Sequence, residues 1–525
     1  ATYNQKQMWT FAEHHPENTS YNVCLACEIL SSFDPSVLKK CFETLVERHE
    51  IFRTTFFEKD GEIVQQIHDH MTLPFEVVDS ADLSKETLEE EVQTKIREKY
   101  DLEKGPLARV TLFMRKDGKA VLVFAMHHIV WDAWSMGVFI QELNHIYSAL
   151  LHHRPISLPP LEQQNKDLSY WQIRFLNTEL GKKQFAYWQQ ELAALPPINL
   201  PFDRPPLPNR VYQGLFVSLM VEKELLDGVK KVLEKSSISL HTFFMAIYKV
   251  LLFRYTGQYD FAINTPIPGR LRADTERKKI DFASNIGYFV NVAIVRSRIK
   301  TGSTFFDFLN ALQKTVLLNR EHQDFPILSL AEEINVKIPE VGYNFLKARP
   351  DDKIHPLSLL FEGHTLQLDD LVIGSFPQSI QADAFDLNIT LLESDGKLNG
   401  SISSRTDIFN LATIERMSRH FLQIVSSVVQ NPDVKLEEID LITSEDILSN
   451  RINNTVRSFP ALRSILEPFE QQTRTAPHHT AASCEGDSLT YEELDLFSNQ
   501  VAHILKQKGV QAEQFVGICV ERKVD

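Results

Sequence analysis

The sequence predicts an α/β protein made of more than one compact unit, on three observations. Its 525 residues are too many for a single hydrophobic core, which seldom grows beyond about 250–300 residues. Apolar runs of strand length alternate with stretches whose apolar residues recur at helical spacing. A proline-rich polar segment, 154–164, interrupts this alternation. We expect it to be a surface connection between two lobes.

Helical and strand patterns are mixed in the first third of the chain. Residues 36–56 start with an apolar stripe at helical spacing and continue into a strand. Residues 119–129 form a continuous apolar run, which predicts a strand buried on both faces. The segment 134–151 predicts a helix, because one stripe carries Phe139, Leu143, Ile146, Tyr147 and Leu150.

The second lobe is predicted to open with a helical segment at 170–192. Residues 239–257 predict an apolar helix that stops at Gly257, since glycine adopts the left-handed conformation that commonly ends helices. YDFAINTPIPGR (259–270) and IGYFVNVAIVRSRI (286–299) are typical of strands. The sequence turns polar after residue 445, and residues 451–464 indicate a linker into a third, incomplete unit.

The charge balance excludes some classes of partner. Lys and Arg number 55 against 70 Asp and Glu, a net charge of -15. Nucleic-acid-binding surfaces are usually basic, so a nucleic-acid partner is not expected. An anionic membrane surface is not expected either, and no apolar stretch is long enough to span a bilayer. The chain starts without Met and stops inside a patterned segment, so we expect it to be a piece of a longer protein.

The five cysteines do not predict a metal site. Cys24 and Cys27 form a CxxC pair, but no second pair completes a zinc-ligand set. They lie in an apolar, strand-like run and are predicted to be packed thiols. Sparse, odd-numbered cysteine in a large chain is typical of a reducing compartment, and we expect a cytoplasmic protein.

The segment MHHIVWDAWSMG (126–137) is the strongest candidate for chemistry. Two histidines end the predicted strand, and because strand side chains alternate, His127 and His128 should face opposite ways. One functional imidazole with a structural neighbour is therefore expected. Histidine is the usual general base near neutral pH. Zinc is disfavoured, since Asp132 is the single further candidate ligand close by.

A structural interpretation of the same segment stands beside the catalytic one. Asp132 precedes a predicted helix and could cap its first turn, as Ser135 also could. A histidine at a strand end next to a capped helix needs no catalytic role. The residue types alone leave the two interpretations open.

Further segments in a fixed order favour the catalytic interpretation. His127, His128, Asp132 and Ser135 match the signature HHxxxDGxS. The other matching segments are YNQKQMW (3–9), RHEIFRTTF (48–56), DLSYWQ (167–172), LPFDRPP (200–206), NIGYFVNVAIVR (285–296) and HQDFPI (322–327). Over about residues 2–445 the chain resembles the condensation domains of non-ribosomal peptide synthetases. Residues 463–510, with LTYEEL at 489–494, resemble the opening of an adenylation domain.

The resemblance implies a fold and a domain order. The expected fold is α/β, with two chloramphenicol-acetyltransferase-like lobes in a V-shaped pseudo-dimer around a central tunnel. The N-terminal lobe would span 1–165 and the C-terminal lobe 166–447. A linker at 448–464 would lead into the truncated N-terminal part of an adenylation domain at 465–525. The later nucleotide-binding motifs of an adenylation domain are absent from this chain, so this part is not expected to adenylate a substrate.

The resemblance also implies an activity. The domain would form an amide bond between a donor acyl or peptidyl thioester and an acceptor aminoacyl thioester. Both would be carried on the phosphopantetheine arms of partner carrier proteins, which enter the tunnel from opposite sides, and the chain itself would hold no covalent cofactor and no metal. The partners are the upstream and downstream carrier proteins and an adenylation domain in cis. We expect the excised piece to be monomeric.

The implied site has one catalytic residue and five supporting ones. His128 would take a proton from the attacking amine or position that amine. Asp132 would pair with Arg270 of the other lobe and organise the site. His127 and Trp134 would pack and form hydrogen bonds around the loop, and Ser135 completes the motif. No substrate-binding residue can be assigned from the sequence.

This chain departs from the family pattern at three positions. Ala133 replaces the usual glycine after Asp132, which puts any role of a closely approaching backbone amide there in doubt. Gln7 stands where arginine is usual, and Asn165 stands where tyrosine is usual. We expect neither of the last two to touch the chemistry.

Two other functions remain open at this stage. One is a catalytically silent domain of the same fold that recruits a partner enzyme, although such domains usually lose the histidine that corresponds to His128. The other is an acyltransferase that uses free acyl-CoA. The two histidines argue against the heterocyclising relatives, which carry aspartates in their place. The adenylation-like tail argues against epimerising relatives.

Overall fold

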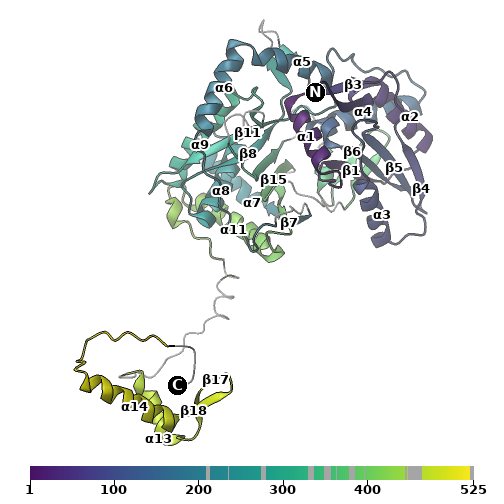
Figure 1. Cartoon of the computed structure of the whole chain (residues 1–525). Helices are drawn as coiled ribbons and strands as arrows, with labels where there is room; N and C mark the ends of the chain where they lie inside the picture. Colours follow the sequence, from purple (N-terminus) through teal and green to yellow (C-terminus); the bar gives the residue numbers. More distant parts are fainter. Residues whose placement is uncertain are drawn as a thin grey trace. The chain divides into compact units, whose positions relative to one another are not determined.

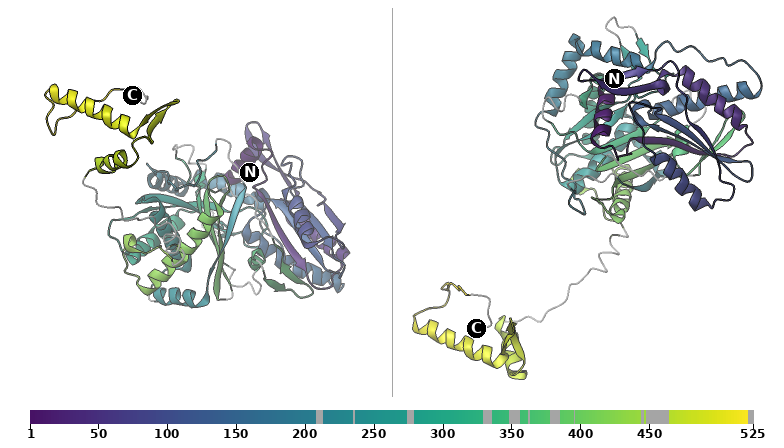
Figure 2. Two further views of the ribbon diagram at one scale, coloured as in Figure 1. Left: turned by 90° about the horizontal axis from the view of Figure 1, so that it is seen from below. Right: turned by 45° about the vertical axis from the view of Figure 1, so that its right-hand side comes forward.

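The computed structural model describes residues 1–207, 213–234, 236–273, 279–328, 336–347, 356–361, 363–377, 385–394, 396–443, 446 and 464–520. The chain divides into two compact units, Ala1–Ser444 and Glu445–Asp525, which we describe separately. The first unit holds two lobes that lie side by side, each built on a six-stranded sheet (Figures 1 and 2).

The N-terminal lobe contains the elements up to helix α4. In chain order these are α1 (Tyr3–His14), β1 (Asn22–Ile29), α2 (Pro35–Arg48), the 3-10 helix η1 (Glu50–Arg53), β2 (Thr54–Lys59), β3 (Glu62–Ile67), β4 (Phe75–Asp79), α3 (Lys85–Arg97), β5 (Ala108–Met114), β6 (Ala120–His127), the 3-10 helix η2 (His128–Val130) and α4 (Ala133–Leu151).

The C-terminal lobe follows a loop at 152–164. Its described elements are α5 (Asn165–Leu176), α6 (Glu179–Leu192), β7 (Gly214–Val221), α7 (Lys223–Leu233), α8 (Leu240–Thr256), β8 (Asp260–Ile267), β9 (Leu271–Ala273), β10 (Lys279–Asp281), β11 (Asn291–Arg298), α9 (Phe305–Glu321), β12 (Val341–Leu346), η3 (Pro356–Leu360), β13 (Thr365–Gln367), β14 (Val372–Ser375), β15 (Leu387–Ser394), β16 (Lys397–Arg405), α11 (Leu411–Gln430) and η4 (Leu436–Glu438).

The N-terminal sheet has helices on both faces, which explains its apolar central strand. Its order is β13-β14-β1-β6-β5-β4, with β4 parallel to β5 and the other pairs antiparallel. Helices α2 and α4 pack on one face. On the other face, α3 packs against Val121 and Val123 of β6. Every residue of β6 is buried, as the continuous apolar run predicts.

The C-terminal sheet is mixed and also covered on both faces. Its order is β11-β8-β12-β15-β16-β7, with β12 parallel to both of its neighbours. Helices α7, α8, α9 and α11 form a large apolar core with one face. On the other face, Trp188 and Leu192 of α6 pack against β8 and β11. The expectation of two α/β lobes is confirmed.

One strand pair crosses from the second lobe to the sheet of the first. β13 and β14 lie within the segment that the sequence analysis assigned to the C-terminal lobe, yet β14 pairs with β1, through Cys27 with Ser375 and Ile29 with Ile373. This crossover was not foreseen. The predicted domain boundaries stay predictions.

The sequence predictions for individual elements are mostly accurate. Helix α8 ends at Thr256, and Gly257 takes a φ of 68° in the left-handed region, as predicted. The strand predicted at 119–129 already ends at His127, and His128 begins a 3-10 turn. The strand predicted from residue 286 starts only at Asn291, so 286–290 form a loop. In that loop the backbone groups of Gly287 and Phe289 bond to side chains of the other lobe.

The second unit contains α13 (Leu466–Thr475), β17 (Thr480–Cys484), β18 (Asp487–Thr490) and α14 (Tyr491–Gln507). Strands β17 and β18 form an antiparallel hairpin, and none of the residues 464–520 is buried. The predicted linker at 448–464 falls outside the described residues, apart from Ser464. No helix among the described residues of the chain is long and apolar enough to cross a membrane.

Candidate active site at the junction of the lobes

His128 lies at the first position of the 3-10 turn that follows β6, and the residue is partly exposed. Its Nδ1 lies 2.6 Å from the carbonyl oxygen of Trp131. A carbonyl can only accept, so Nδ1 must carry a proton and donate it. In the neutral ring, the lone pair then resides on Nε2. The turn itself is held by the backbone N–H of His128, which donates to the Tyr21 carbonyl at 2.7 Å.

His127 is the structural neighbour. It ends β6, is buried, and its Nδ1 accepts a hydrogen bond from the backbone N–H of Ile129 at 3.2 Å. Burial, with a smaller contribution from the charge of His128, lowers the pKa of His127 to about 3. His127 therefore stays neutral at physiological pH and caps the turn that carries His128.

Asp132 is both a helix cap and one half of a buried ion pair. Its Oδ1 accepts from the backbone N–H of Ser135 at 2.8 Å, which caps α4 as predicted. The same oxygen pairs with the Arg270 guanidinium. The side chains of Asp132 and Arg270 are 0% and 2% exposed, so each neutralises a charge that water cannot reach. The structural and the site-organising interpretations of Asp132 are thus compatible.

Three motif residues of the first lobe bind the backbone of one loop in the second lobe. Asp132 Oδ2 accepts from the N–H of Phe289 at 3.0 Å, and Ser135 Oγ accepts from the N–H of Gly287 at 3.0 Å. Trp134 Nε1 donates to the carbonyl of Ala283 at 2.9 Å. The motif therefore clamps residues 283–289 across the junction.

Arg270 secures the same loop from within the second lobe. Its guanidinium donates to the carbonyls of Phe282 and Asn285 and lies over the Phe289 ring, 4.1 Å from its centroid. Gly269 precedes it with a φ of 61°, and a Cβ there would lie 2.2 Å from the Phe289 carbonyl oxygen. Only glycine allows this approach of the two backbone segments.

Tyr288, carried by the clamped loop, is the second-lobe residue that faces His128. The two rings meet edge to face, with centroids 5.3 Å apart and planes at 86°. Burial raises the pKa of the Tyr288 hydroxyl, so this ring stays neutral. Tyr288 was not among the site residues predicted from the sequence. Its position inside the matched segment NIGYFVNVAIVR was the available signal.

The three departures from the family pattern have different surroundings. Ala133 is exposed in the first turn of α4. Gln7 is half-buried on α1. Asn165 is buried, and it donates to the Tyr288 carbonyl and accepts from Gln5. Asn165 therefore binds the backbone of Tyr288, whose ring meets His128, which the sequence did not suggest.

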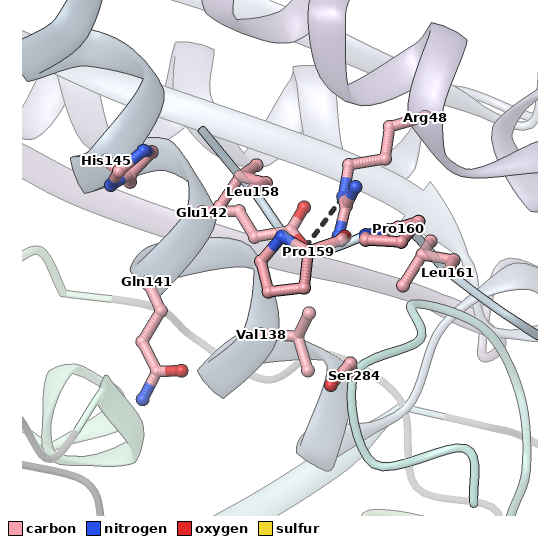
Figure 3. A pocket seen from close by; sticks show the side chains of 10 residues that line it. All are labelled: Arg48, Val138, Gln141, Glu142, His145, Leu158, Pro159, Pro160, Leu161 and Ser284. Carbon is pink, nitrogen blue, oxygen red and sulfur yellow. Dashed lines mark hydrogen bonds and ion pairs between the residues drawn. The ribbon is translucent and has the colours of Figure 1, made fainter. Parts of the chain in front are cut away.

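A cavity of about 310 Å³ is lined mainly by α4 and the loop 158–161, together with Ser284 of the second-lobe loop 283–289 (Figure 3). The two charged side chains Arg48 and Glu142 in its lining are paired, since Glu142 accepts from Arg48 Nε at 2.9 Å. Glu142 also lies 2.8 Å from Nε2 of His49. None of the six predicted site residues lines it. We assign no function to this cavity.

The described residues contain no cluster of three or more His, Cys, Asp or Glu that could hold a metal ion. Cys24 and Cys27 lie in β1 and form no disulfide. Burial raises the pKa of both to about 12, so both thiols stay protonated at neutral pH.

Comparison with solved structures defines the class of fold. A four-domain nonribosomal peptide synthetase bound to AMP and glycine matches with a TM-score of 0.79 at 19% identity, over 97% of this chain and 39% of that one. The X-domain in its complex with OxyB from teicoplanin biosynthesis matches at 0.73 and 23%, over 84% and 96%. A mutant starter condensation domain of rhizomide synthetase in complex with C8-CoA matches at 0.71 and 16%, over 84% and 97%. The expected condensation-domain fold is confirmed.

Sequence comparison identifies the family. The family model described as "Condensation domain" matches residues 1–447, and that of "AMP-binding enzyme" matches 469–525. The chain therefore belongs to the condensation-domain family of nonribosomal peptide synthetases, followed by a partial AMP-binding region.

Curated relatives are antibiotic synthetases. Gramicidin S synthase 2 of Brevibacillus brevis is 31% identical over 99% of this chain and 11% of its own length. Tyrocidine synthase 3 of Brevibacillus parabrevis is also 31% identical, over 99% of this chain and 8% of its own length. The chain thus spans about a tenth of the length of these relatives. Condensation domains are generally amide-bond-forming transferases.

Proposed function

We propose that this chain catalyses amide-bond formation between a donor acyl or peptidyl thioester and an acceptor aminoacyl thioester. Both substrates would be tethered to carrier proteins through phosphopantetheine arms. The observation that carries the proposal is the state of His128, a partly exposed residue at the junction of the lobes: its Nδ1 donates to the Trp131 carbonyl, which leaves the lone pair of the neutral ring on Nε2.

In the proposed reaction the acceptor amine attacks the carbonyl carbon of the donor thioester. A C–N bond forms, and the nitrogen's surplus proton passes to Nε2 of His128. The tetrahedral intermediate then collapses, the C–S bond breaks, and the proton is returned to the departing thiolate. His128 thus ends the cycle neutral, with Nδ1 still donating to Trp131.

Positioning supplies much of the rate in this proposal. Two tethered substrates that meet end to end react as if in one molecule, which is worth more than proton transfer alone. The clamp formed by Asp132, Trp134 and Ser135 fixes the second-lobe loop beside His128. We infer that the tunnel implied by the family passes through this junction and that the arms approach His128 from its two ends.

The test is a condensation assay with two loaded carrier proteins. His128→Ala should lower the rate of product formation by about 10² to 10⁴-fold. His145→Ala is the control, because it removes an exposed imidazole that lies ten residues beyond Ser135 on α4, and its rate should equal that of wild type. Equal product from His128→Ala and wild type would remove His128 from its role.

Two further assays test the other candidate functions. Product with free acyl-CoA and no donor carrier would favour the CoA-dependent acyltransferase, a possibility motivated by the C8-CoA named with one structural neighbour. No product from wild type with any donor would favour the recruiting scaffold, motivated by the neighbour solved in complex with OxyB.

A further inference from the structure

Gln5, in the first turn of α1, is a fully buried amide whose hydrogen bonds lead to the His128 turn. Its Nε2 donates to the carbonyl of Ile129 at 3.1 Å, the residue after His128. The same nitrogen lies 3.2 Å from Asn165 Oδ1. Its Oε1 accepts from the backbone N–H of Thr2 at 3.0 Å and from Gln65 Nε2 at 2.7 Å. Both donors and both acceptor positions of this amide are therefore used.

Asn165, at the start of α5, extends the hydrogen bonds of Gln5 to the second lobe. It is 2% exposed, and its Nδ2 donates to the carbonyl of Tyr288 at 3.2 Å. Gly287 makes room for it, because a Cβ there would lie 2.7 Å from Asn165 Nδ2. Gln5 and Asn165 together connect the backbone on either side of the His128–Tyr288 ring contact. We call this pair the amide bridge.

The amide bridge can have only one orientation. The carbonyls of Ile129 and Tyr288 can only accept, so each must be met by an amide nitrogen. The N–H of Thr2 can only donate, so it must meet Gln5 Oε1. These end points leave Asn165 Oδ1 as the acceptor for Gln5 Nε2. Rotating either amide by half a turn would place two oxygens in contact at a buried position, which is costly.

We propose that Gln5 and Asn165 are positioning residues for the reaction: their fixed amide polarity holds the His128 turn against the Tyr288 loop and so fixes the direction of the His128 imidazole. This inference rests on the proposed function for its catalytic consequence. Its geometric part concerns the ring of His128 alone. Neither residue contacts the reacting atoms in this proposal.

The sharpest variant is Asn165→Asp, which keeps the side chain's shape, replaces the donating nitrogen by an oxygen and adds a carboxylate charge, as the matched control also does. An aspartate oxygen would then face the Tyr288 carbonyl. The matched control is Asn319→Asp on α9. Asn319 is also 2% exposed, donates to the carbonyl of Ile294 at 3.0 Å and accepts from the Tyr187 hydroxyl at 2.7 Å. The control repeats the same change at a buried amide outside the bridge.

Two measurements test the proposal on the full chain. The first is ¹⁵N-histidine NMR, with the His128 signal assigned from its loss in His128→Gln. Wild type and Asn319→Asp should show the Nδ1–H tautomer, and Asn165→Asp should show a mixture of tautomers. The second is steady-state kinetics with loaded carriers. Asn165→Asp should lower kcat by about 10-fold to 10²-fold with KM for the carriers unchanged.

The outcomes separate the two hypotheses. An unchanged His128 tautomer in folded Asn165→Asp overturns the bridge, whatever the activity. Equal tautomer and kcat changes in both variants also overturn it, because the effect would then follow from any buried amide. A tautomer change confined to Asn165→Asp, with no product from wild type either, supports the bridge and contradicts the proposed function. If Asn165→Asp does not fold, Asn165→Ala is measured against Asn319→Ala with the same criteria.

Discussion

At the scale of single residues, two adjacent histidines differ because an element ends between them. His127 is the last residue of β6 and is buried, with its pKa lowered to about 3. His128 starts the 3-10 turn and is partly exposed. The sequence predicted one functional and one structural imidazole from strand alternation. The structure separates the two histidines by burial at the end of the strand, and the functional role of His128 stays a prediction.

The buried Asp132–Arg270 pair makes a prediction about stability at the residue scale. Asp132→Ala leaves the Arg270 guanidinium buried without its carboxylate, so the free energy of unfolding should fall by about 3–5 kcal/mol. Urea unfolding, followed by circular dichroism, measures this loss. Asp34→Ala removes an exposed aspartate that caps α2 and should cost about 1 kcal/mol. An Asp132→Ala protein that unfolds like wild type would contradict a structural role for the pair.

At the scale of elements, α8 carries the most unusual buried group. This helix is apolar on nearly all sides and packs against the second sheet and against its neighbours α9 and α11. Lys249 in its middle is fully buried. Its Nζ donates to the carbonyl of Val295 at 2.8 Å and lies 5.0 Å from the centroid of the Phe261 ring. Burial lowers the pKa of this lysine to about 7.

The Lys249 pKa predicts that stability depends on pH. Between about pH 7 and the ordinary lysine pKa of about 10.4, the unfolded chain holds a proton that the folded chain lacks. Stability therefore rises with pH across that window, by up to about 1.4 kcal/mol per pH unit from this group. Below pH 7 both states are protonated, and the contribution is constant.

Lys249→Met should remove this dependence and raise stability most at pH 7, with a gain that shrinks towards pH 9. Urea unfolding at both pH values measures the difference. Lys300→Met, at an exposed position, should show no such change. A gain from Lys249→Met that is equal at pH 7 and pH 9 would mean that the buried lysine keeps an ordinary pKa.

At the scale of the first unit, the lobes are joined in two ways. Strand β14 extends the N-terminal sheet beside β1. The motif on η2 and α4 binds the backbone of residues 283–289. The first lobe therefore depends on chain segments more than 100 residues away from it in sequence. Neither connection can be predicted from the periodicity of neighbouring residues.

A fragment of residues 1–165 should consequently fail to fold on its own. It lacks β13 and β14, and the Asp132 carboxylate would have no arginine partner. We expect no cooperative thermal transition for this fragment by near-ultraviolet circular dichroism, while residues 1–447 should melt cooperatively. A cooperative transition in the short fragment would show that the first lobe is independent.

The sequence by itself determined the α/β class, the positions of helices such as α4 and α8, and the histidine to which we assign the chemistry. These depend on local periodicity, capping and motif spacing, which are written in consecutive residues. Only the tertiary structure decided the crossover of β14, the clamp on residues 283–289 and the bridge through Gln5 and Asn165. Each of these joins backbone groups far apart in the chain. A backbone carbonyl or N–H has no residue-specific signal, so its partner becomes known only when the chain is folded.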